Sequence, residues 1–298
     1  MTAHEGPVDA PAWREPWRTG GLIAAVRRPR LLWHLVRVER GERFEGTLLG
    51  GLFWQFAQPI VKFFMYLVVV GVILGLTKRV DNFAIYVFCG VIMVQFFNAA
   101  MKSGTKSMAR STSLLRRVNL PRELVPMTAV LAQILRLGPA TIVLLVVAAF
   151  SGWRPNHLVG IPYALGGILL VVVFLVGLGL ILSVGNTYVR DVGFGVELAA
   201  MMTHWISPVL YPLDLVTKTL GSGPLYTLYL ANPLTIAMMG LRETFWAPTV
   251  SADQAADIEI PGLALGLSVV ISVATLLVGL AVVRRYSHRL VLRDTWKL

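Results

Sequence analysis

The sequence contains little cysteine and little charge. Cys89 is the only cysteine in 298 residues, so no disulfide framework can form within the chain. Charged residues make up 14% of the sequence against 56% hydrophobic residues, and no polar stretch reaches the roughly 50 residues of an independent soluble domain. We therefore expect one membrane domain, with Cys89 as a packing residue.

Side chains suited to catalysis, metal binding and nucleotide binding are also scarce. None of the five histidines forms a pair at metal-ligand spacing, which argues against a metal site and against a membrane enzyme acting on lipid-linked sugars. Gly104-Thr105-Lys106-Ser107 imitates part of a phosphate-binding loop, but that motif needs glycines in place of Ala100 and Thr105 and a preceding buried strand. We expect this chain to bind neither a metal nor ATP.

Six long apolar stretches dominate the sequence. About 20 mostly apolar residues in a helix cross the roughly 30 Å hydrocarbon core of a bilayer. The pattern therefore predicts an all-α integral membrane protein with six transmembrane helices. The expected spans are 59–76, 83–101, 124–150, 158–184, 194–213 and 260–283.

Basic residues divide unevenly between the two sides of these spans. With the N-terminus inside, the segments 1–58, 102–123, 185–193 and 284–298 are cytoplasmic and hold 20 of the 27 lysines and arginines, which fits the positive-inside rule. Membrane orientation and anionic lipid thus account for the net charge of +11, and nucleic-acid binding is not needed. The expected domains are a disordered cytoplasmic tail at 1–28, a membrane domain at 29–283 and a cytoplasmic C-terminal tail at 284–298.

The segment 29–50 has the character of a helix lying on the cytoplasmic membrane surface. Pro29 suits the first turn of a helix, and apolar residues follow at helical spacing. Arginines and glutamates supply a charged side, with Trp33 as an interfacial anchor. The alternative is a plain charged extension before the first span.

Prolines and glycines interrupt residues 206–233, which also mix apolar runs with Asp214 and Lys218. A straight helix cannot form through such a stretch, and the segment is too apolar for an ordinary loop. We expect two short re-entrant helices between the fifth and sixth spans, where non-spanning backbone faces protein or water. The alternative is a segment that lies on the outer surface of the membrane.

The loop before the third span is expected to hold a short cytoplasmic helix at 114–119. Pro121 then begins the next helix. A helix this short needs a surface on which to pack, and a partner protein would provide one.

Charged residues within or beside the spans are candidates for function, because hydrocarbon makes them costly. Arg136 lies inside the third span and is expected to meet either a phosphate group or an internal acid, with Glu197 or Glu243 as the structural alternative. Lys62 is expected to extend to the cytoplasmic interface. Arg242 and Glu243 are expected either to contact a diphosphate or to cap a short helix.

Five motifs follow one another along the chain: LLWHLVRVERGERFEGTLLGGLFWQFAQP, NLPRELVP, NTYVRDV, ISPVLYPLDLV and ANPLTIAMMGLRETF. In this order they resemble the ABC-2 type permease subunits that export O-antigen, teichoic acid and related cell-envelope polysaccharides. Glu42, Arg43 and Glu45 only approximate the charged pattern usual in that family before the first span. The resemblance implies a permease homodimer with two copies of a separate ATPase, which binds ATP and Mg. It also implies a polyprenyl-diphosphate-linked glycan as substrate, exported across the bacterial inner membrane.

The resemblance further implies roles for individual residues. Those that would contact the ATPase are Leu114, Leu115, Arg116, Arg117 and Asn119 in a coupling helix, and Arg190 and Asp191 in a second loop. Those that would border the path of the substrate are Trp33, Arg37, Phe64, Tyr66, Arg136, Trp205, Tyr211 and Tyr229. Aromatic faces suit a sliding carbohydrate, although packing and interfacial belts are the commoner uses of aromatic residues in spans.

Other functions remain open on the sequence alone. An ABC-2 permease that exports a drug or a lipid would share these motifs. A proton- or ion-coupled carrier would place acids near mid-membrane, but only Glu197 approaches that depth and no internal repeat is found. The glycan is not identified: the abundance of Ala, Gly, Val, Leu and Arg is typical of a high-GC genome, where a galactan would be a natural cargo, beside teichoic acid and O-antigen polymers.

Overall fold

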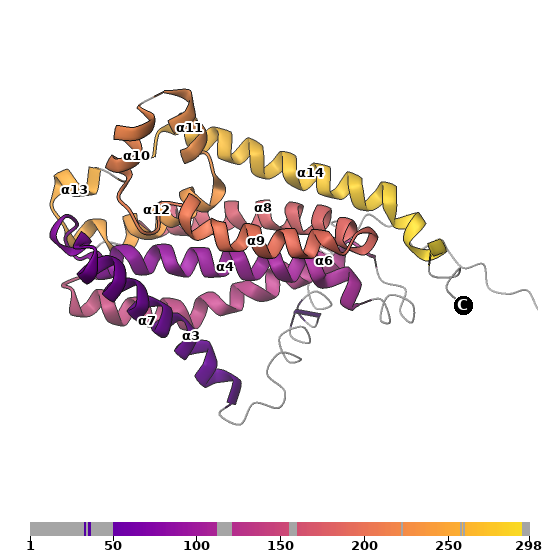
Figure 1. Cartoon of the computed structure of the whole chain (residues 1–298), viewed down its shortest axis with the longest axis horizontal. Coiled ribbons are helices and arrows are strands. Elements are labelled where there is room, and N and C mark those ends of the chain that lie inside the picture. The colour runs from indigo at the N-terminus through magenta and orange to yellow at the C-terminus, as the bar shows by residue number, and fades with distance from the viewer. Residues whose placement is uncertain are drawn as a thin grey trace, which may run out of the picture.

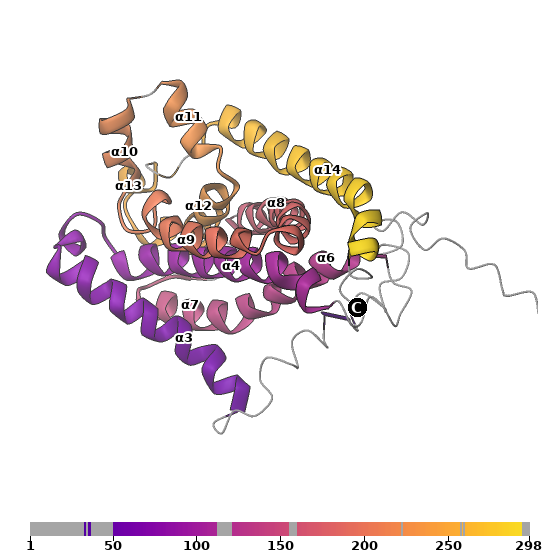
Figure 2. The same ribbon diagram turned by 45° about the vertical axis from the view of Figure 1, so that its right-hand side comes forward.

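The computed structural model describes Trp33 and residues 35–36, 50–111, 121–154, 160–221, 223–256, 258 and 260–293. All regular structure among these residues is helical. The α-helices are α3 (Gly50–Tyr66), α4 (Phe83–Arg110), α6 (Leu124–Leu131), α7 (Leu137–Phe150), α8 (Ile161–Tyr188), α9 (Asp191–Ile206), α10 (Leu213–Leu220), α11 (Pro224–Leu230), α12 (Pro233–Phe245), α13 (Ala252–Ala256) and α14 (Gly262–Arg293). The helices α10, α11 and α13 gather at one end of the bundle, and the C-terminal end of α14 lies at the other (Figure 1 and Figure 2).

Five helical stretches within the described residues are long and apolar enough to cross a membrane. The first joins α3 to the π-helix η2 (Leu67–Ile73), and the third joins α6 and α7 through the 3-10 helix η4 (Ala132–Arg136). The stretches are Phe53–Ile73, Phe83–Arg110, Leu124–Phe150, Ile161–Tyr188 and Gly262–Tyr286. Five of the six expected spans therefore have a helical counterpart.

The expected fifth span, 194–213, takes a different form. Helix α9 ends at Ile206, and its 16 residues fall short of the about 20 that cross a bilayer. Ser207 adopts an extended conformation, which the following Pro208 favours, and the helix stops there. The six-span topology is therefore not established, and a membrane crossing by α9 stays a prediction.

Several other boundaries differ from the expected ones. Helix α4 continues nine residues beyond the expected end of the second span and carries Lys102, Lys106 and Arg110, which the hydropathy pattern assigns to a loop. Helix α14 continues to Arg293, into the expected C-terminal tail. Of the expected surface helix at 29–50, the structure describes Trp33, 35–36 and Gly50; the rest of that helix and the expected coupling helix lie outside the described residues.

Residues 207–232 are broken into short helices by proline and glycine. Helix α10 follows Pro212, and α11 and α12 each begin with a proline at the first helical position. Gly221 ends α10 with φ of 67°, a left-handed conformation that favours glycine. Whether these helices re-enter the bilayer stays a prediction.

The fully buried Arg242 of α12 fastens the broken segment to α4. Its Nη2 donates to the carbonyl oxygens of Pro208 at 2.7 Å and Val209 at 3.4 Å, and its Nε donates to that of Tyr86 at 3.3 Å. The guanidinium carbon also lies 3.5 Å from the centre of the Tyr86 ring, a cation–π contact. Arg242 therefore serves the fold, and its burial gives it no access to a diphosphate.

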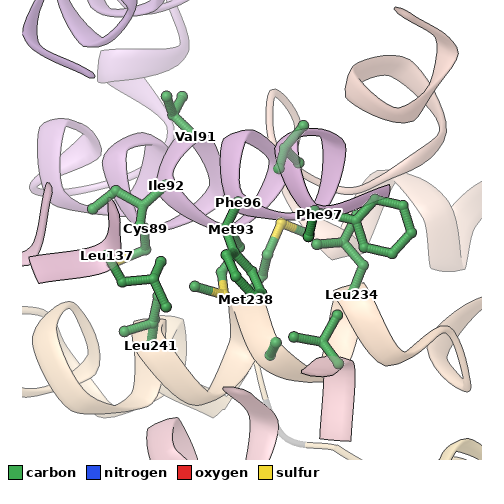
Figure 3. Packing of buried hydrophobic residues seen from close by; sticks show 14 of the residues in the cluster. Cys89, Val91, Ile92, Met93, Phe96, Phe97, Leu137, Leu234, Met238 and Leu241 are labelled. Carbon is green, nitrogen blue, oxygen red and sulfur yellow. The ribbon is translucent and has the colours of Figure 1, made fainter. Parts of the chain in front are cut away.

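Helix α4 forms the core of the bundle. The part of α4 up to Met101 is mostly apolar and largely buried, and α4 contacts α3, α6, α7, α8, α9 and α12. In Figure 3, Met93 and Phe97 of α4 lie against the face of α12 that carries Leu234 and Met238, and all four side chains are buried.

Helix α8 packs against α12 and α14 through glycine. A Cβ placed on Gly167 would lie 2.7 Å from the Cα of Ala237, and one on Gly177 would lie 2.5 Å from the backbone nitrogen of Leu276. Such close approach of backbones is typical of membrane helices, which associate by packing rather than by exclusion of water. A Cβ placed on Gly166, the neighbour of Gly167, would meet no atom of another element within 4 Å.

We predict opposite effects of alanine at Gly166 and Gly167. Gly167→Ala forces α8 away from α12 and should cost about 1–3 kcal/mol of stability, which lowers the melting temperature of the purified protein in detergent. Gly166→Ala gains up to about 1 kcal/mol of helix propensity and should leave the melting temperature unchanged or raised. Equal melting temperatures for the two variants would contradict the packing described here.

Candidate functional site

A cleft of about 1040 Å³ lies between α3, α4, α7 and α9. Helix α3 crosses beside α4 and α7, and α9 packs on another side of α4 (Figure 2). The cleft is therefore bounded by segments from three of the five long stretches and by the short helix α9. Its lining residues are Trp54, Gln55, Gln58, Pro59, Lys62, Tyr66, Ile92, Gln95, Phe96, Asn98, Ala99, Lys102, Ser103, Lys106, Arg110, Arg136, Leu137, Ala140, Ala200, Met201, His204, Trp205 and Leu210.

The charge of this lining has one sign. Lys62, Lys102, Lys106, Arg110 and Arg136 are basic, and no acidic residue is among the described residues that line the cleft. Three of the five come from α4, at intervals of four residues, which places them along one side of the helix. The cleft is accordingly suited to an anionic ligand.

One carboxylate reaches the basic residues from the rim. Nζ of Lys106 donates to Oε1 of Glu197 at 2.5 Å, and both side chains are partly exposed. This ion pair joins the C-terminal part of α4 to the first turns of α9. On sequence, Glu197 is a candidate partner for Arg136, and the structure pairs it with Lys106.

Amide groups add uncharged polar contacts deeper in the cleft. The Nδ2 of Asn98 donates to the carbonyl oxygen of Ala200 at 3.0 Å and so joins α4 to α9. Oδ1 of Asn98 and Nε2 of Gln95 are buried and have no hydrogen-bond partner within the described part of the chain. A buried polar atom without a partner costs about 1–3 kcal/mol, so these two atoms favour water or the polar groups of a ligand in the cleft.

Aromatic rings lie beside these polar groups. Tyr66 of α3 stacks on His204 of α9, with 6.0 Å between ring centres and an angle of 21°. Trp54, Phe96 and Trp205 also line the cleft. Flat apolar faces next to hydrogen-bonding groups are a suitable surface for a sugar chain.

Three of the eight residues expected to border a substrate path line this cleft: Tyr66, Arg136 and Trp205. Phe64 is exposed on α3, away from the cleft, and Trp33 is also exposed. Arg37 lies outside the described residues.

The remaining two, Tyr211 and Tyr229, lie at the broken segment. Their hydroxyl groups are 3.0 Å apart, and the hydroxyl of Tyr211 also donates to the carbonyl oxygens of Trp205 and Ile206, at 3.1 and 3.2 Å. Tyr211 thereby satisfies carbonyl groups at the end of α9, and neither tyrosine lines the cleft.

The coupling residues can be placed only in part. Arg190 and Asp191 stand exposed at the start of α9, immediately after α8. Leu114, Leu115, Arg116, Arg117 and Asn119 lie outside the described residues.

Sequence reasoning misses Lys102, Lys106, Arg110 and His204 as cleft residues. The apolar run ends at Met101, so hydropathy assigns the three basic residues to a cytoplasmic loop. Their spacing of four, at 102, 106 and 110, is the available signal, because that spacing keeps residues on one side of a continuing helix. Lys62 is expected to extend to the interface, and it faces the cleft.

Comparison with known proteins identifies the family. The profile of the ABC-2 type transporter family matches residues 32–246, which include every helix that lines the cleft. The chain belongs to the ABC-2 type transporter family. It is therefore a multi-pass membrane protein and a transporter permease.

Three curated relatives of this permease bear the name O-antigen export system permease protein RfbA. One, from Myxococcus xanthus, is 25% identical over 217 residues, which cover 72% of this chain and 80% of the relative. Two from Klebsiella pneumoniae are 22% identical over 249 residues and 23% identical over 232 residues. These matches cover 83% and 76% of this chain, and 88% and 85% of the relatives.

We predict that water reaches the cleft of the permease and not the neighbouring face of α3. Gln58 lines the cleft, whereas Val61, three residues further along, is 62% exposed but does not line it. In lipid nanodiscs, Gln58→Cys should react with a charged, water-soluble thiol reagent, because thiolate forms only where water is present. Val61→Cys should stay unlabelled, as should the native chain, whose Cys89 is fully buried. Equal labelling at 58 and 61 would contradict a water-filled cleft.

Proposed function

We propose that this chain is the membrane-spanning subunit of an ATP-driven exporter. Its substrate would be a polyprenyl-diphosphate-linked cell-envelope polysaccharide, moved from the cytoplasmic to the outer face of a bacterial inner membrane. The family supports the transporter assignment, and the names of the three relatives support a polysaccharide substrate. The observation that carries the proposal is the cleft, which combines basic, amide and aromatic side chains between apolar helices.

The chemistry of the cleft fits such a substrate better than an apolar one. A glycan presents many hydroxyl groups, and burying each without a hydrogen bond in hydrocarbon would cost kilocalories. A polar conduit removes that cost. An exporter of uncharged drugs or lipids would gain nothing from Lys62, Lys102 and Lys106 along its path, and the names of the relatives favour a polysaccharide over an anionic lipid, so we place the drug or lipid alternative second.

A second copy of the chain would complete the conduit. Helix α9 exposes a continuous apolar side, formed by Phe194, Leu198, Met201, Met202 and Trp205, and Met201 and Trp205 also border the cleft. A homodimer that buried this side would enclose the two clefts between the subunits. Two copies of a separate ATPase, carrying ATP and Mg, would complete the exporter.

The ATPase would act through the cytoplasmic ends of α4 and α9. The segment 114–119 follows α4, and Arg190 and Asp191 begin α9, so both proposed contacts lead directly into helices that line the cleft. ATP binding would move these ends and open the conduit, and hydrolysis would reset them. We place both termini of the chain in the cytoplasm, on the side with most of the lysines and arginines.

We predict that depletion of this chain in its native host causes lipid-linked saccharides to accumulate in the inner membrane. The glycan is made on the cytoplasmic face and would have no route outward. Lipid extraction followed by sugar analysis would measure the pool and identify the polymer. Depletion of the partner ATPase should give the same pool.

Two results would contradict this proposal. An unchanged pool of lipid-linked saccharide would favour a drug or a lipid as the substrate. Full export with an ATPase that binds but cannot hydrolyse ATP would remove the proposed power stroke.

A further inference from the structure

The basic residues of the cleft lie where charge is costly. Lys62 belongs to the span Phe53–Ile73, and Arg136 belongs to Leu124–Phe150. Neither Lys62 nor Lys102 has an ion pair or a hydrogen bond among the described residues, although both line the cleft. Ionisable residues at membrane depth commonly mark a path for a charged substrate, and here the charge selects an anion.

A carboxylate, Glu197, reaches one of these basic residues from the rim of the cleft. Glu197 forms an ion pair with Lys106. The side chain of Lys106 is 45% exposed and that of Glu197 is 42% exposed. Ion pairs as exposed as this one contribute little free energy, so a more highly charged ligand can replace the carboxylate. A diphosphate ester has more negative charge and more acceptor oxygens than one carboxylate, and it can contact several basic residues at once.

We infer that this cleft binds the diphosphate group of the lipid carrier through Lys62, Lys102 and Lys106, and that Glu197 is the internal competitor that the diphosphate displaces from Lys106. The inference rests on the proposed function, which supplies a diphosphate-linked substrate. It locates the diphosphate group of the lipid carrier in the cleft and implies that substrate binding changes a contact between α4 and α9.

That consequence is a link between substrate and helix position. The Lys106–Glu197 pair fastens the C-terminal end of α4 to α9, and each of these helix ends adjoins a proposed ATPase contact. When the diphosphate takes Lys106, α9 loses this attachment to α4. Binding of the substrate would thereby remove one contact between the two helix ends that the ATPase moves, while the hydrogen bond from Asn98 to Ala200 remains.

The test uses the full-length chain in nanodiscs of phosphatidylcholine, with geranylgeranyl diphosphate as the probe and direct titration as the measurement. Lys62→Gln and Lys102→Gln should each weaken binding about tenfold, the loss expected for one charge-assisted hydrogen bond. Lys102→Arg should retain the affinity, which separates loss of charge from loss of folding. Glu197→Gln should tighten binding severalfold, because the competitor has lost its charge.

A second ion pair provides matched controls. Lys218 and Asp214 of α10 form a pair at 2.7 Å that lies away from the cleft. Lys218→Gln and Asp214→Asn should leave the affinity for the probe unchanged. If they alter it as much as the cleft variants do, the effect is one of overall charge and the inference is overturned.

Competing anions identify what the site recognises. Phosphatidylglycerol at equal concentration should not displace the probe, and displacement would overturn the inference in favour of a general contact with anionic lipid. Inorganic pyrophosphate should compete, which would assign recognition to the diphosphate group rather than to the lipid chain. Failure of geranylgeranyl diphosphate to bind, or a Glu197→Gln variant that binds more weakly, would also overturn it.

These outcomes are separable from those of the depletion experiment. If lipid-linked saccharide accumulates on depletion but the cleft variants bind the probe like the native chain, the function stands and the site is wrong. If the pool is unchanged on depletion, the proposed function fails whatever the nanodisc titration shows.

Discussion

Hydrocarbon offers no hydrogen bonds, so a membrane protein whose backbone leaves a helix must supply partners from its own side chains. The segment after α9 meets this requirement. The hydroxyl of Tyr211 donates to the carbonyl oxygen of Trp205 near the end of α9, and Arg242 donates to those of Pro208 and Val209. The hydroxyl of Tyr86 donates to the carbonyl oxygen of Tyr211 at 3.2 Å. These bonds hold the broken segment against α4, and α4 in turn forms a wall of the cleft. The shape of the cleft therefore depends on the hydrogen bonds that the backbone carbonyls receive where α9 ends.

The same constraint separates two kinds of charged residue in the bundle. Arg242 is fully buried: its Nε and Nη2 donate to backbone carbonyls, its guanidinium lies over an aromatic ring, and its Nη1 has no hydrogen-bond partner among the described residues. Lys62 and Lys102 have no such cage among the described residues and border a cleft large enough for water and for a ligand. Burial alone would have ranked Arg242 as the functional cation. The partners of each cation rank them the other way. Arg242 binds backbone carbonyls and so stabilises the fold, whereas Lys62 and Lys102 face an open polar cleft and are better candidates for contact with a substrate.

Much of this architecture could be predicted from sequence, and the exceptions have physical causes. Hydropathy located five spans because each is a continuous apolar helix. It misplaced the end of α4, because the helix continues where one side turns basic, and it counted Val209 and Leu210 toward a span although Pro208 had already ended the helix. The contacts of Arg242 were beyond reach, since its partners Pro208 and Tyr86 lie 34 and 156 residues away. Tyr66 and Arg136 could each be predicted from sequence to border the substrate path. That they line the same cleft as Lys102 could not, because it depends on how three helices pack.

A transport site must release what it binds, and Glu197 can promote release by competing with the substrate for Lys106. Several cations that contact one diphosphate would bind it tightly, and tight binding slows release and turnover. A carboxylate that can return to Lys106 lowers the net affinity, because the bound state must give up the Lys106–Glu197 pair and departure of the ligand restores it. On the proposed function, Glu197, which pairs with Lys106 beside the basic cleft, lets the site release the substrate after binding it. Glu197 lies on α9 six residues after Asp191, a proposed ATPase contact, so on this proposal the same ion pair couples the presence of substrate to the ATPase.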